Sequence, residues 1–292
     1  MREGRIIKGI GGFYYIDSEE GLFECKARGI FRKNNLTPMV GDYVFFTVLD
    51  VEEKKGVIEE IKPRRNMLFR PPVANVDQVI VVFAVTQPDP NLSLLDRFLI
   101  LAEKEDLDIV ICFNKIDLLP LEEYQWMLDI YSRVGYKVIT TSKDHPISLD
   151  DLRQALAERV SVVAGPSGVG KSSLLNHVQS NIHLQTGEVS NKTERGKHTT
   201  RHVELIPLDQ KGWVVDTPGF SNLRMDFTGE LQLTHYFPEF LKPSEECKFT
   251  SCLHEKEPQC GIKEAVSIGE ISESRYESYL QLLEEIRGNR KY

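Results

Sequence analysis

Short apolar segments with alternating hydrophobic and polar positions fill the first 70 residues of the chain. Glycine-containing turns separate these segments at close spacing, which is typical of strands joined by tight connections. The pattern predicts five strands, over 4–10, 12–17, 22–28, 43–49 and 57–61. Five short strands without a long helix favour a small closed barrel, and the OB-fold is the barrel of this size that fits best.

The hydrophobic pattern changes after residue 76, where continuous apolar runs alternate with helical segments. The runs predict buried strands over 76–84, 108–113, 136–140 and 160–164, followed later by 213–215. The intervening segments predict helices over 93–104, 121–133 and 148–158, and another helix starts at Ser172. This strand and helix rhythm is typical of a parallel sheet covered by helices on both faces.

The last segment ends in a helix with one apolar stripe, which we expect to pack against the rest of that segment. The stripe comprises Tyr276, Tyr279, Leu280, Leu283 and Ile286. A chain of 292 residues is near the practical limit of one core, so several domains are expected. The changes in pattern predict a barrel over 1–70, an α/β domain over 73–222 and a helical domain over 223–292.

The junction between strand 160–164 and the next helix carries a phosphate-binding motif. Gly165-Pro166-Ser167-Gly168-Val169-Gly170-Lys171-Ser172 matches G-x-x-x-x-G-K-[ST] in the required strand-to-helix context. Its backbone N–H groups would bind phosphate oxygens, Lys171 the β- and γ-phosphates, and the Ser172 hydroxyl Mg²⁺. Ser173, in the first helical turn, belongs to the same predicted site. The alternative is a glycine-rich turn without a ligand.

A second motif indicates which base is bound. Asn114-Lys115-Ile116-Asp117 follows strand 108–113, at the strand end where open α/β sheets bind ligands. The Asp117 carboxylate would accept hydrogen bonds from N1–H and the 2-amino group of guanine, and adenine offers neither donor there. Lys115 would cover the ring with its methylenes, and Asn114 would tie the loop to its neighbours. Taken alone, so short a motif would often be a solvent-exposed turn without a ligand.

Three further segments belong to the predicted pocket. Thr141, Ser142 and Lys143 close strand 136–140 as a second base-contacting loop, although a plain strand-to-helix connection is the alternative. Asp216-Thr217-Pro218-Gly219 ends strand 213–215, which places the Asp216 carboxylate near Mg²⁺ and the Gly219 N–H near the γ-phosphate. The polar stretch 196–201 is the candidate switch I, with Thr200, or else Thr199, as its Mg²⁺ ligand.

The residue that would orient the attacking water is not the glutamine of Ras-like enzymes. Phe220 follows Gly219 and cannot hold water, so we expect assistance from elsewhere. His198 is the candidate catalytic residue, because an imidazole can hold or deprotonate water near neutral pH. The alternative is an exposed loop histidine without a catalytic role. Slow turnover is expected until a partner orders the 196–201 stretch.

The order of these motifs differs from that of ordinary GTPases, because the guanine loop precedes the phosphate loop. The sequence resembles the circularly permuted GTPases, and with its flanking domains it resembles the RsgA (YjeQ) family. That resemblance implies GTP hydrolysis stimulated by the 30S subunit, a role in late small-subunit maturation, and contact with 16S rRNA. A GTP-dependent switch acting on a protein partner is the alternative. A plain RNA-binding protein with a degenerate nucleotide site is disfavoured, since Asp117 and Lys171 are both present.

A cluster of possible metal ligands lies near the C-terminus. Cys247, Cys252, His254 and Cys260 fall within fourteen residues and can complete a tetrahedral Zn²⁺ site with no open position, so the metal would be structural. The spacing departs from paired C-x2-C fingers but fits the zinc segment of the resembled family. A disulfide with a spare thiol is the alternative, disfavoured because no signal peptide opens the chain.

Composition and charge narrow the remaining classes. The 41% apolar and 27% charged content is ordinary for a globular protein, and no apolar run is long enough to predict a membrane span. The absence of a signal peptide favours a cytoplasmic protein, and we expect a monomer. Because the net charge is −8, RNA contact requires a local basic patch, and the barrel region alone is positive. Its candidate contacts are Phe13, Tyr14, Tyr15, Arg28, Phe31, Arg32 and Lys33, although alternate aromatics would instead fill the barrel.

Overall fold

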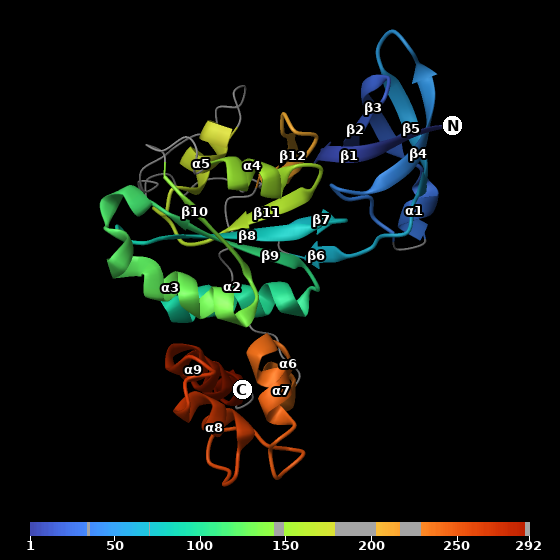
Figure 1. The fold of residues 1–292 in the computed structure, drawn as a ribbon. Helices are drawn as coiled ribbons and strands as arrows, with labels where there is room; N and C mark the ends of the chain where they lie inside the picture. The colour runs from blue at the N-terminus through green and yellow to red at the C-terminus, as the bar shows by residue number, and fades with distance from the viewer. Residues whose placement is uncertain (34–35, 70, 143–148, 179–202, 217–228, 290–292) are drawn as a thin grey trace, which may run out of the picture.

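The computed structural model describes the chain except for residues 34–35, 70, 143–148, 179–202, 217–228 and 290–292. A barrel of strands stands at one side of a central layer of strands and helices, and a helical module lies below that layer in the view of Figure 1. These three parts are the barrel, the central α/β layer and the C-terminal module, and together they give the predicted fold class.

The barrel is the predicted five-stranded one, with one short helix inserted between its third and fourth strands. Its strands follow the order β1-β2-β3-β5-β4, and β1 also pairs with β4, which closes the barrel. Side chains that alternate along the strands fill its interior, as Ile6, Phe23 and Phe46 illustrate. The elements are β1 Arg2–Ile10, β2 Phe13–Ser18, β3 Gly21–Ala27, α1 Gly29–Lys33, β4 Tyr43–Asp50 and β5 Lys55–Ile61.

The central sheet has the order β10-β9-β8-β11-β13-β12, and all neighbours except β12 and β13 are parallel. A short hairpin, β6 with β7, connects it to the barrel. The elements in chain order are β6 Met67–Phe69, β7 Pro72–Ala74, β8 Gln78–Ala84, α2 Leu92–Lys104, β9 Asp108–Asn114, η1 Ile116–Leu118, α3 Leu121–Val134, β10 Lys137–Thr141, α4 Asp150–Leu156, β11 Val160–Ala164, α5 Lys171–Val178, β12 Glu204–Pro207 and β13 Trp213–Asp216.

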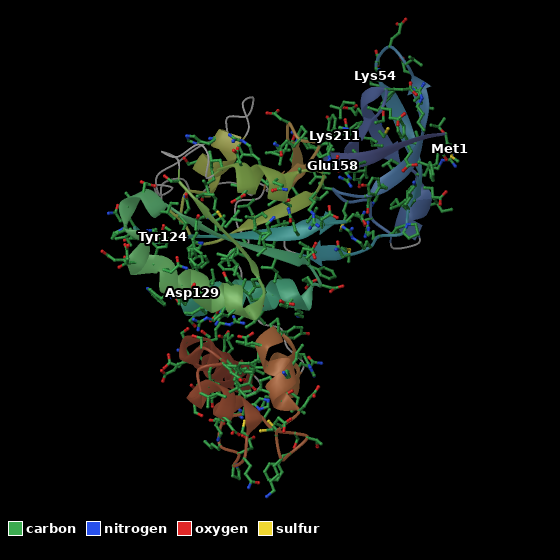
Figure 2. All side chains as sticks on the ribbon, viewed as in Figure 1. Met1, Lys54, Tyr124, Asp129, Glu158 and Lys211 are labelled. Carbon is green, nitrogen blue, oxygen red and sulfur yellow. The ribbon has the colours of Figure 1, made fainter. Side chains whose placement is uncertain are left out.

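Both faces of this sheet are covered, as the strand pattern predicts. Val79, Val81 and Phe83 of β8 belong to the apolar cluster that includes α2 and α3, where Tyr124 lies on α3 (Figure 2). Ile80 and Val82, the residues between them, belong to the opposite cluster with α4 and α5. Two-sided burial explains why these strands appear in the sequence as continuous apolar runs.

Strand β12 was not predicted, and it joins the barrel to the sheet. It pairs antiparallel with β1 at Lys8 and Glu204, so barrel and central strands form one continuous eleven-stranded sheet. The Lys8 ammonium also lies 2.6 Å from a Glu204 carboxylate oxygen. The four-residue strand escapes sequence analysis because it is too short to show an alternating pattern.

The C-terminal module packs its helices around the predicted apolar stripe. Tyr279, Leu283 and Ile286 are at most 3% exposed, so the expected packing of the last helix is confirmed. Among the described residues, none of the helices has the length and apolarity to span a membrane. The elements are α6 Glu230–His235, η3 Pro238–Phe240, α7 Leu241–Ser244, α8 Gly261–Ser267 and α9 Glu273–Asn289.

Candidate nucleotide site and metal centre

The phosphate-binding motif forms the loop between β11 and α5, as its sequence predicts. Gly165 has φ +134°, and a Cβ there would lie 2.1 Å from the carbonyl oxygen of Val82 in the neighbouring strand. Gly170 has φ +95°, and a Cβ there would lie 2.5 Å from the side-chain nitrogen of Asn114. Glycine is therefore required at both positions, by backbone conformation and by close approach.

Lys171 begins α5 and folds back over this loop. Its ammonium donates hydrogen bonds to the carbonyl oxygens of Gly165 and Pro166, at 2.8 and 2.6 Å. Burial lowers the pKa of this ammonium from its usual value. The positive charge is thus held at the loop where the motif predicts the phosphates.

Asn114, the last residue of β9, connects the guanine motif to the phosphate loop. Its side-chain nitrogen donates to the carbonyl oxygen of Val169 at 2.8 Å, and its side-chain oxygen accepts from the Thr141 hydroxyl at 3.1 Å. The Cys112 thiol lies 3.2 Å from the same hydroxyl. Because Asn114 is 5% exposed, this network fixes the position of the loop that follows it.

Lys115 makes the second connection between the two loops. Its backbone is left-handed, with φ +64°, and its ammonium donates to the carbonyl oxygen of Gly168 at 2.8 Å. The same ammonium donates to the carbonyl oxygen of Gln87. Two motifs that are about half a domain apart in sequence therefore share one site in the folded chain.

Asp117 lies beyond these anchors, on the short helix η1, and is exposed. One of its carboxylate oxygens accepts a hydrogen bond from the Ser142 hydroxyl, which leaves further acceptor capacity on the carboxylate. Ser142 directly follows β10, so the structure brings the second predicted base loop to the first. An exposed, oriented carboxylate is the group that recognition of guanine requires.

Part of the predicted site lies outside the described residues. Lys143 of the second base loop is one such residue, and the others are nearer the predicted Mg²⁺: His198, Thr199, Thr200 and Gly219. Asp216 ends β13, which runs parallel to β11, so its backbone reaches the same edge of the sheet as the phosphate loop. Ser172 and Ser173 occupy the first turn of α5.

Two contributors to the nucleotide site were missed by sequence analysis. The Gln87 carbonyl accepts from Lys115, and the Cys112 thiol supports Thr141. Gln87 follows β8, and the C-terminal edge of a parallel sheet is where loops bind ligands, so its position was a usable signal. Cys112 gives no such signal, because a buried thiol in a strand resembles any small apolar residue.

The four predicted metal ligands come together in the C-terminal module. Their ligand atoms all lie within 4.8 Å of one another. The Cys247 and Cys260 sulfurs are 3.8 Å apart, and they lie 3.6 and 3.4 Å from Nδ1 of His254. Tetrahedral Zn²⁺ with Zn–S of about 2.3 Å and Zn–N of about 2.0 Å gives S–S edges of about 3.8 Å and S–N edges of about 3.5 Å. The donor set and its spacing therefore fit Zn²⁺.

The surroundings of this cluster hold the ligands in place. The Tyr276 hydroxyl donates to the His254 carbonyl oxygen at 2.6 Å, and the Tyr279 hydroxyl donates to the Leu253 carbonyl oxygen at 3.0 Å. Burial raises the pKa of the Cys252 thiol to about 12 and lowers the pKa of His254. A neutral imidazole can bind a metal ion directly, whereas the cysteine thiols must lose their protons when the metal ion binds.

Comparison with known proteins agrees with this geometry. A model described as the RsgA GTPase matches residues 61–226, more than half of the chain. The chain belongs to the RsgA GTPase family. A second model, the RsgA N-terminal domain, matches residues 3–58, the range of the barrel. As a member of the RsgA family, the chain is a GTPase.

Curated relatives and solved structures match this chain over at least 98% of its length. A relative from Alkaliphilus metalliredigens, named small ribosomal subunit biogenesis GTPase RsgA, is 56% identical over all of both chains. One of the same name from Caldanaerobacter subterraneus is 50% identical over 99% of this chain and 97% of its own. The structure of YloQ, described as a circularly permuted GTPase, is 41% identical with a TM-score of 0.84, covering 99% and 96% of the two chains. YjeQ from Thermotoga maritima is 40% identical with a TM-score of 0.86, covering 98% and 99%. The predicted circular permutation is thus confirmed.

Proposed function

We propose that this RsgA-family GTPase acts in small-subunit biogenesis, where it binds the 30S particle late in maturation and hydrolyses GTP in response to it. The contact of Asn114 and Lys115 with the phosphate loop carries the nucleotide part of this proposal. The names of relatives that are up to 56% identical over the full chain support the partner. The competing role, a switch for a protein partner outside the ribosome, has no comparable support.

The proposed roles within the nucleotide site follow from chemistry and position. Asp117 accepts hydrogen bonds from guanine, and Lys171 neutralises the β- and γ-phosphates. The proposed GTP-contacting set is Asn114, Lys115, Asp117, Thr141, Ser142, Lys143, Gly165, Pro166, Ser167, Gly168, Val169, Gly170, Lys171, Ser172, Ser173 and Gly219. The proposed Mg²⁺ ligands are Ser172, Thr200 and Asp216, and Mg²⁺ would stabilise charge on the transferring phosphoryl group.

His198 is the proposed catalytic residue of this site. Phe220 stands where Ras-like enzymes place a water-orienting glutamine, so the imidazole of His198 would hold or deprotonate the attacking water instead. The free protein would then turn over slowly. Docking on the subunit would raise the rate by bringing His198 to the water.

The remaining proposals concern the architecture and its partners. Zn²⁺ on Cys247, Cys252, His254 and Cys260 would be structural, because four protein ligands leave no open position. The domain limits would be 1–70, 73–222 and 223–292. The barrel would contact 16S rRNA, since the barrel region carries a small positive charge in a chain of net charge −8. A ribosomal partner would place the protein in the cytoplasm, and we propose that it acts there as a monomer.

Hydrolysis of GTP in the presence of purified ribosomal particles tests this function. We expect purified 30S subunits to raise the turnover rate at least about tenfold, whereas 50S subunits and tRNA leave it unchanged. Lys171→Ala would abolish the stimulated rate in the same preparation. Equal stimulation by 30S and 50S subunits, or none by either, would contradict the proposed function.

A further inference from the structure

The outer face of β4 carries two aromatic rings that the barrel does not bury. Tyr43 and Phe45 alternate with Val44 and Phe46, which are 0% exposed and point inward, whereas Tyr43 is 38% exposed. In the paired strand β1, Arg5 stands opposite Tyr43 and Glu3 opposite Phe45. Residues two apart on one strand lie about 7 Å apart on the same face. The two rings therefore form a short row on the barrel surface.

Each of these rings has a cation above it. The guanidinium carbon of Arg5 lies 4.3 Å from the centroid of the Tyr43 ring, and the Lys62 ammonium lies 4.8 Å from that of Phe45. Arg5 also donates to the Tyr43 hydroxyl, and Lys62 pairs with Glu3. Aromatic rings paired with cations are the chemistry by which proteins hold single-stranded nucleic acid, with stacking for bases and charge for phosphates.

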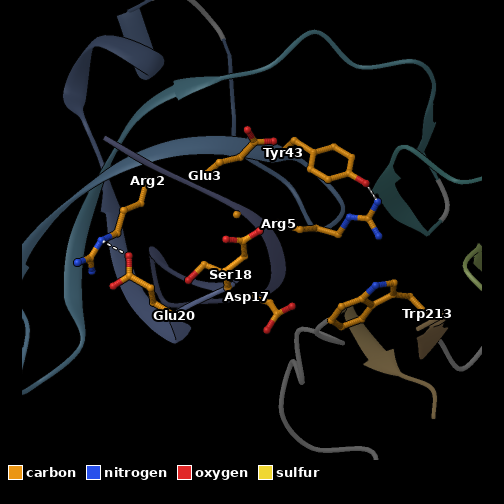
Figure 3. Close-up of a pocket in the computed structure, with 10 residues that line it drawn as sticks. Arg2, Glu3, Arg5, Asp17, Ser18, Glu20, Tyr43 and Trp213 are labelled. Atoms are coloured by element: carbon orange, nitrogen blue, oxygen red, sulfur yellow. Dashed lines mark hydrogen bonds and ion pairs between the residues drawn. The ribbon is translucent and has the colours of Figure 1, made fainter. Parts of the chain in front are cut away.

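A cleft of about 620 Å³ opens at the end of this row, where the barrel meets the central layer. Figure 3 shows Arg5 and Tyr43 on one wall and Trp213, the first residue of β13, on the other. Four carboxylates, those of Glu3, Asp17, Glu19 and Glu20, also line the cleft, so it offers oxygen acceptors for amino groups of a base, and phosphates would lie outside it. The cleft thus adds a third ring, contributed by a different domain, to the two on β4.

We propose that Tyr43, Phe45 and Trp213 form a stacking surface for unpaired bases of small-subunit RNA, with Arg5 and Lys62 facing its phosphates. The choice of small-subunit RNA as the partner rests on the proposed function, and the new element is the place where that RNA is bound. Because the cations sit directly on the rings, the surface can hold RNA although the chain is acidic overall. Its two walls belong to different parts of the protein, so RNA bound here would bridge the barrel and the GTPase layer.

The surface differs from the one that the sequence suggested. Of the earlier candidates, Phe31 is 7% exposed and fills the barrel core, so it is not available to RNA. Phe13 lies on β2 with the Lys26 ammonium 4.9 Å from its ring, which gives one ring and one cation on the opposite side of β1. Phe13 is therefore a matched control: an aromatic and cation pair on the same barrel, outside the proposed surface.

Binding of a fluorescein-labelled, twelve-nucleotide single-stranded RNA to the full-length protein tests the proposal by fluorescence anisotropy. Tyr43→Leu/Phe45→Leu keeps apolar bulk on the strand but removes both rings, and we expect affinity to fall at least about tenfold. Phe13→Leu should change affinity less than about twofold. An equal loss in both variants, or a loss only in Phe13→Leu, would overturn the proposal. Melting temperatures within a few degrees of the parent confirm that the variants fold.

Tryptophan emission gives a second readout, because the chain has only two tryptophans. In Trp126→Phe only Trp213 emits, and stacking of a base should quench it on addition of RNA. In Trp213→Phe the emission comes from Trp126 on α3, and RNA should leave it unchanged. Unquenched Trp213 fluorescence at saturating RNA would show that no base stacks in the cleft, so the cleft would not belong to the stacking surface.

The proposed function can fail separately from this surface. If 30S subunits fail to stimulate GTP hydrolysis by the parent protein while Tyr43→Leu/Phe45→Leu still weakens RNA binding, the proposed function is wrong and the surface stands. If stimulation by 30S is intact in the parent and equally strong at limiting subunit concentration in the double variant, the surface is wrong and the function stands.

Discussion

The central layer is joined to its two neighbours by different kinds of contact. Toward the barrel, β1 pairs with β12 and one apolar cluster runs through both parts. Toward the C-terminal module, Ile100 of α2 joins the apolar cluster of α9, but buried polar side chains also cross between the two helices. Arg275 of α9 and Asp96 of α2 are both 0% exposed, with 2.7 Å between guanidinium and carboxylate. Ser93 and Gln281, 2.8 Å apart, add a second link.

The two junctions should respond differently to mutation. Apolar burial and backbone pairing are spread over many atoms, so a single surface charge matters little there. At the other junction, Arg275 also donates to Glu239 and lies 4.7 Å above the Phe237 ring, so two buried carboxylates depend on one cation. Loss of that cation leaves the Asp96 and Glu239 carboxylates without a counter-ion, although Asp96 keeps the hydrogen bond from the Tyr131 hydroxyl, and an uncompensated buried charge is costly. At this junction a few buried polar side chains thus add a sensitive contact to the apolar packing of Ile100.

Removal of the proposed zinc should have the largest effect, and it should act on the C-terminal module and its junction through α9, not on the central sheet. Metal binding contributes about 10–16 kcal/mol to small zinc modules, so the segment around His254 would unfold without it. Amide hydrogen exchange after chelation should show lost protection in α8 and α9, with β8 and β11 still protected. Unchanged exchange in α9, or equal loss in β8, would contradict a separate structural zinc centre.

Arg275→Met should destabilise the protein by about 3–5 kcal/mol, because Asp96 and Glu239 lose their counter-ion in a buried setting. Urea unfolding followed by circular dichroism measures the change. Arg287→Met is the matched control: Arg287 lies on the same helix and also contacts two carboxylates, but its side chain is 34% exposed. Its loss should cost about 1 kcal/mol or less. An equal loss of unfolding free energy in the two variants would show that burial of the Arg275 ion pairs does not increase their contribution to stability.

Gly41→Ala tests the barrel junction through its backbone. Gly41 has φ +91°, and a Cβ there would lie 2.0 Å from the Ala74 carbonyl oxygen in β7, so we expect a loss of about 2 kcal/mol or more. Gly135→Ala, with φ +103° and no atom within 4 Å of the added Cβ, isolates the conformational cost, at about 1 kcal/mol. Thermal unfolding compares them, and identical shifts would argue against close packing at this junction.

Reversing the Lys8 and Glu204 pair should have the smallest effect. Each single reversal should cost about 1 kcal/mol or less, since both side chains are about one-third exposed. The double reversal Lys8→Glu/Glu204→Lys should recover most of that loss in a double-mutant cycle of unfolding free energies. Single losses above about 3 kcal/mol would mean that this junction, too, depends on one ion pair.

Much of the fold was predictable because its strands and helices have strong periodic signals. The strand 160–164 and the helix around 121–133 agree with the structure to within a residue. The barrel was also recoverable, since its strands alternate inward and outward residues. Strands β6, β7 and β12 were not, because three or four residues carry no period.

The site was predictable where short motifs specify chemistry, and less so where partners are distant in sequence. The contact between Asn114 and Val169 could be expected only because the two motifs together describe one nucleotide pocket. The hydrogen bond to the Gln87 carbonyl and the burial of Arg275 depend on tertiary packing, which no motif indicates. A sequence shows Arg275 as one more charged residue of a polar helix. Its role appears only when Asp96, 179 positions earlier, is brought next to it.

The central claim is that Asp117 and Lys171 contact the same nucleotide, Lys171 at its phosphates and Asp117 at its base, and that Asp117 selects guanine. Isothermal titration calorimetry with non-hydrolysable GTP and ATP analogues, on the parent protein and on Asp117→Ala, tests it most directly. We predict that the parent binds the GTP analogue at least about a hundredfold more tightly than the ATP analogue, and that Asp117→Ala loses most of this difference. Equal affinity of the parent for both analogues, or undiminished preference in the variant, would contradict the account.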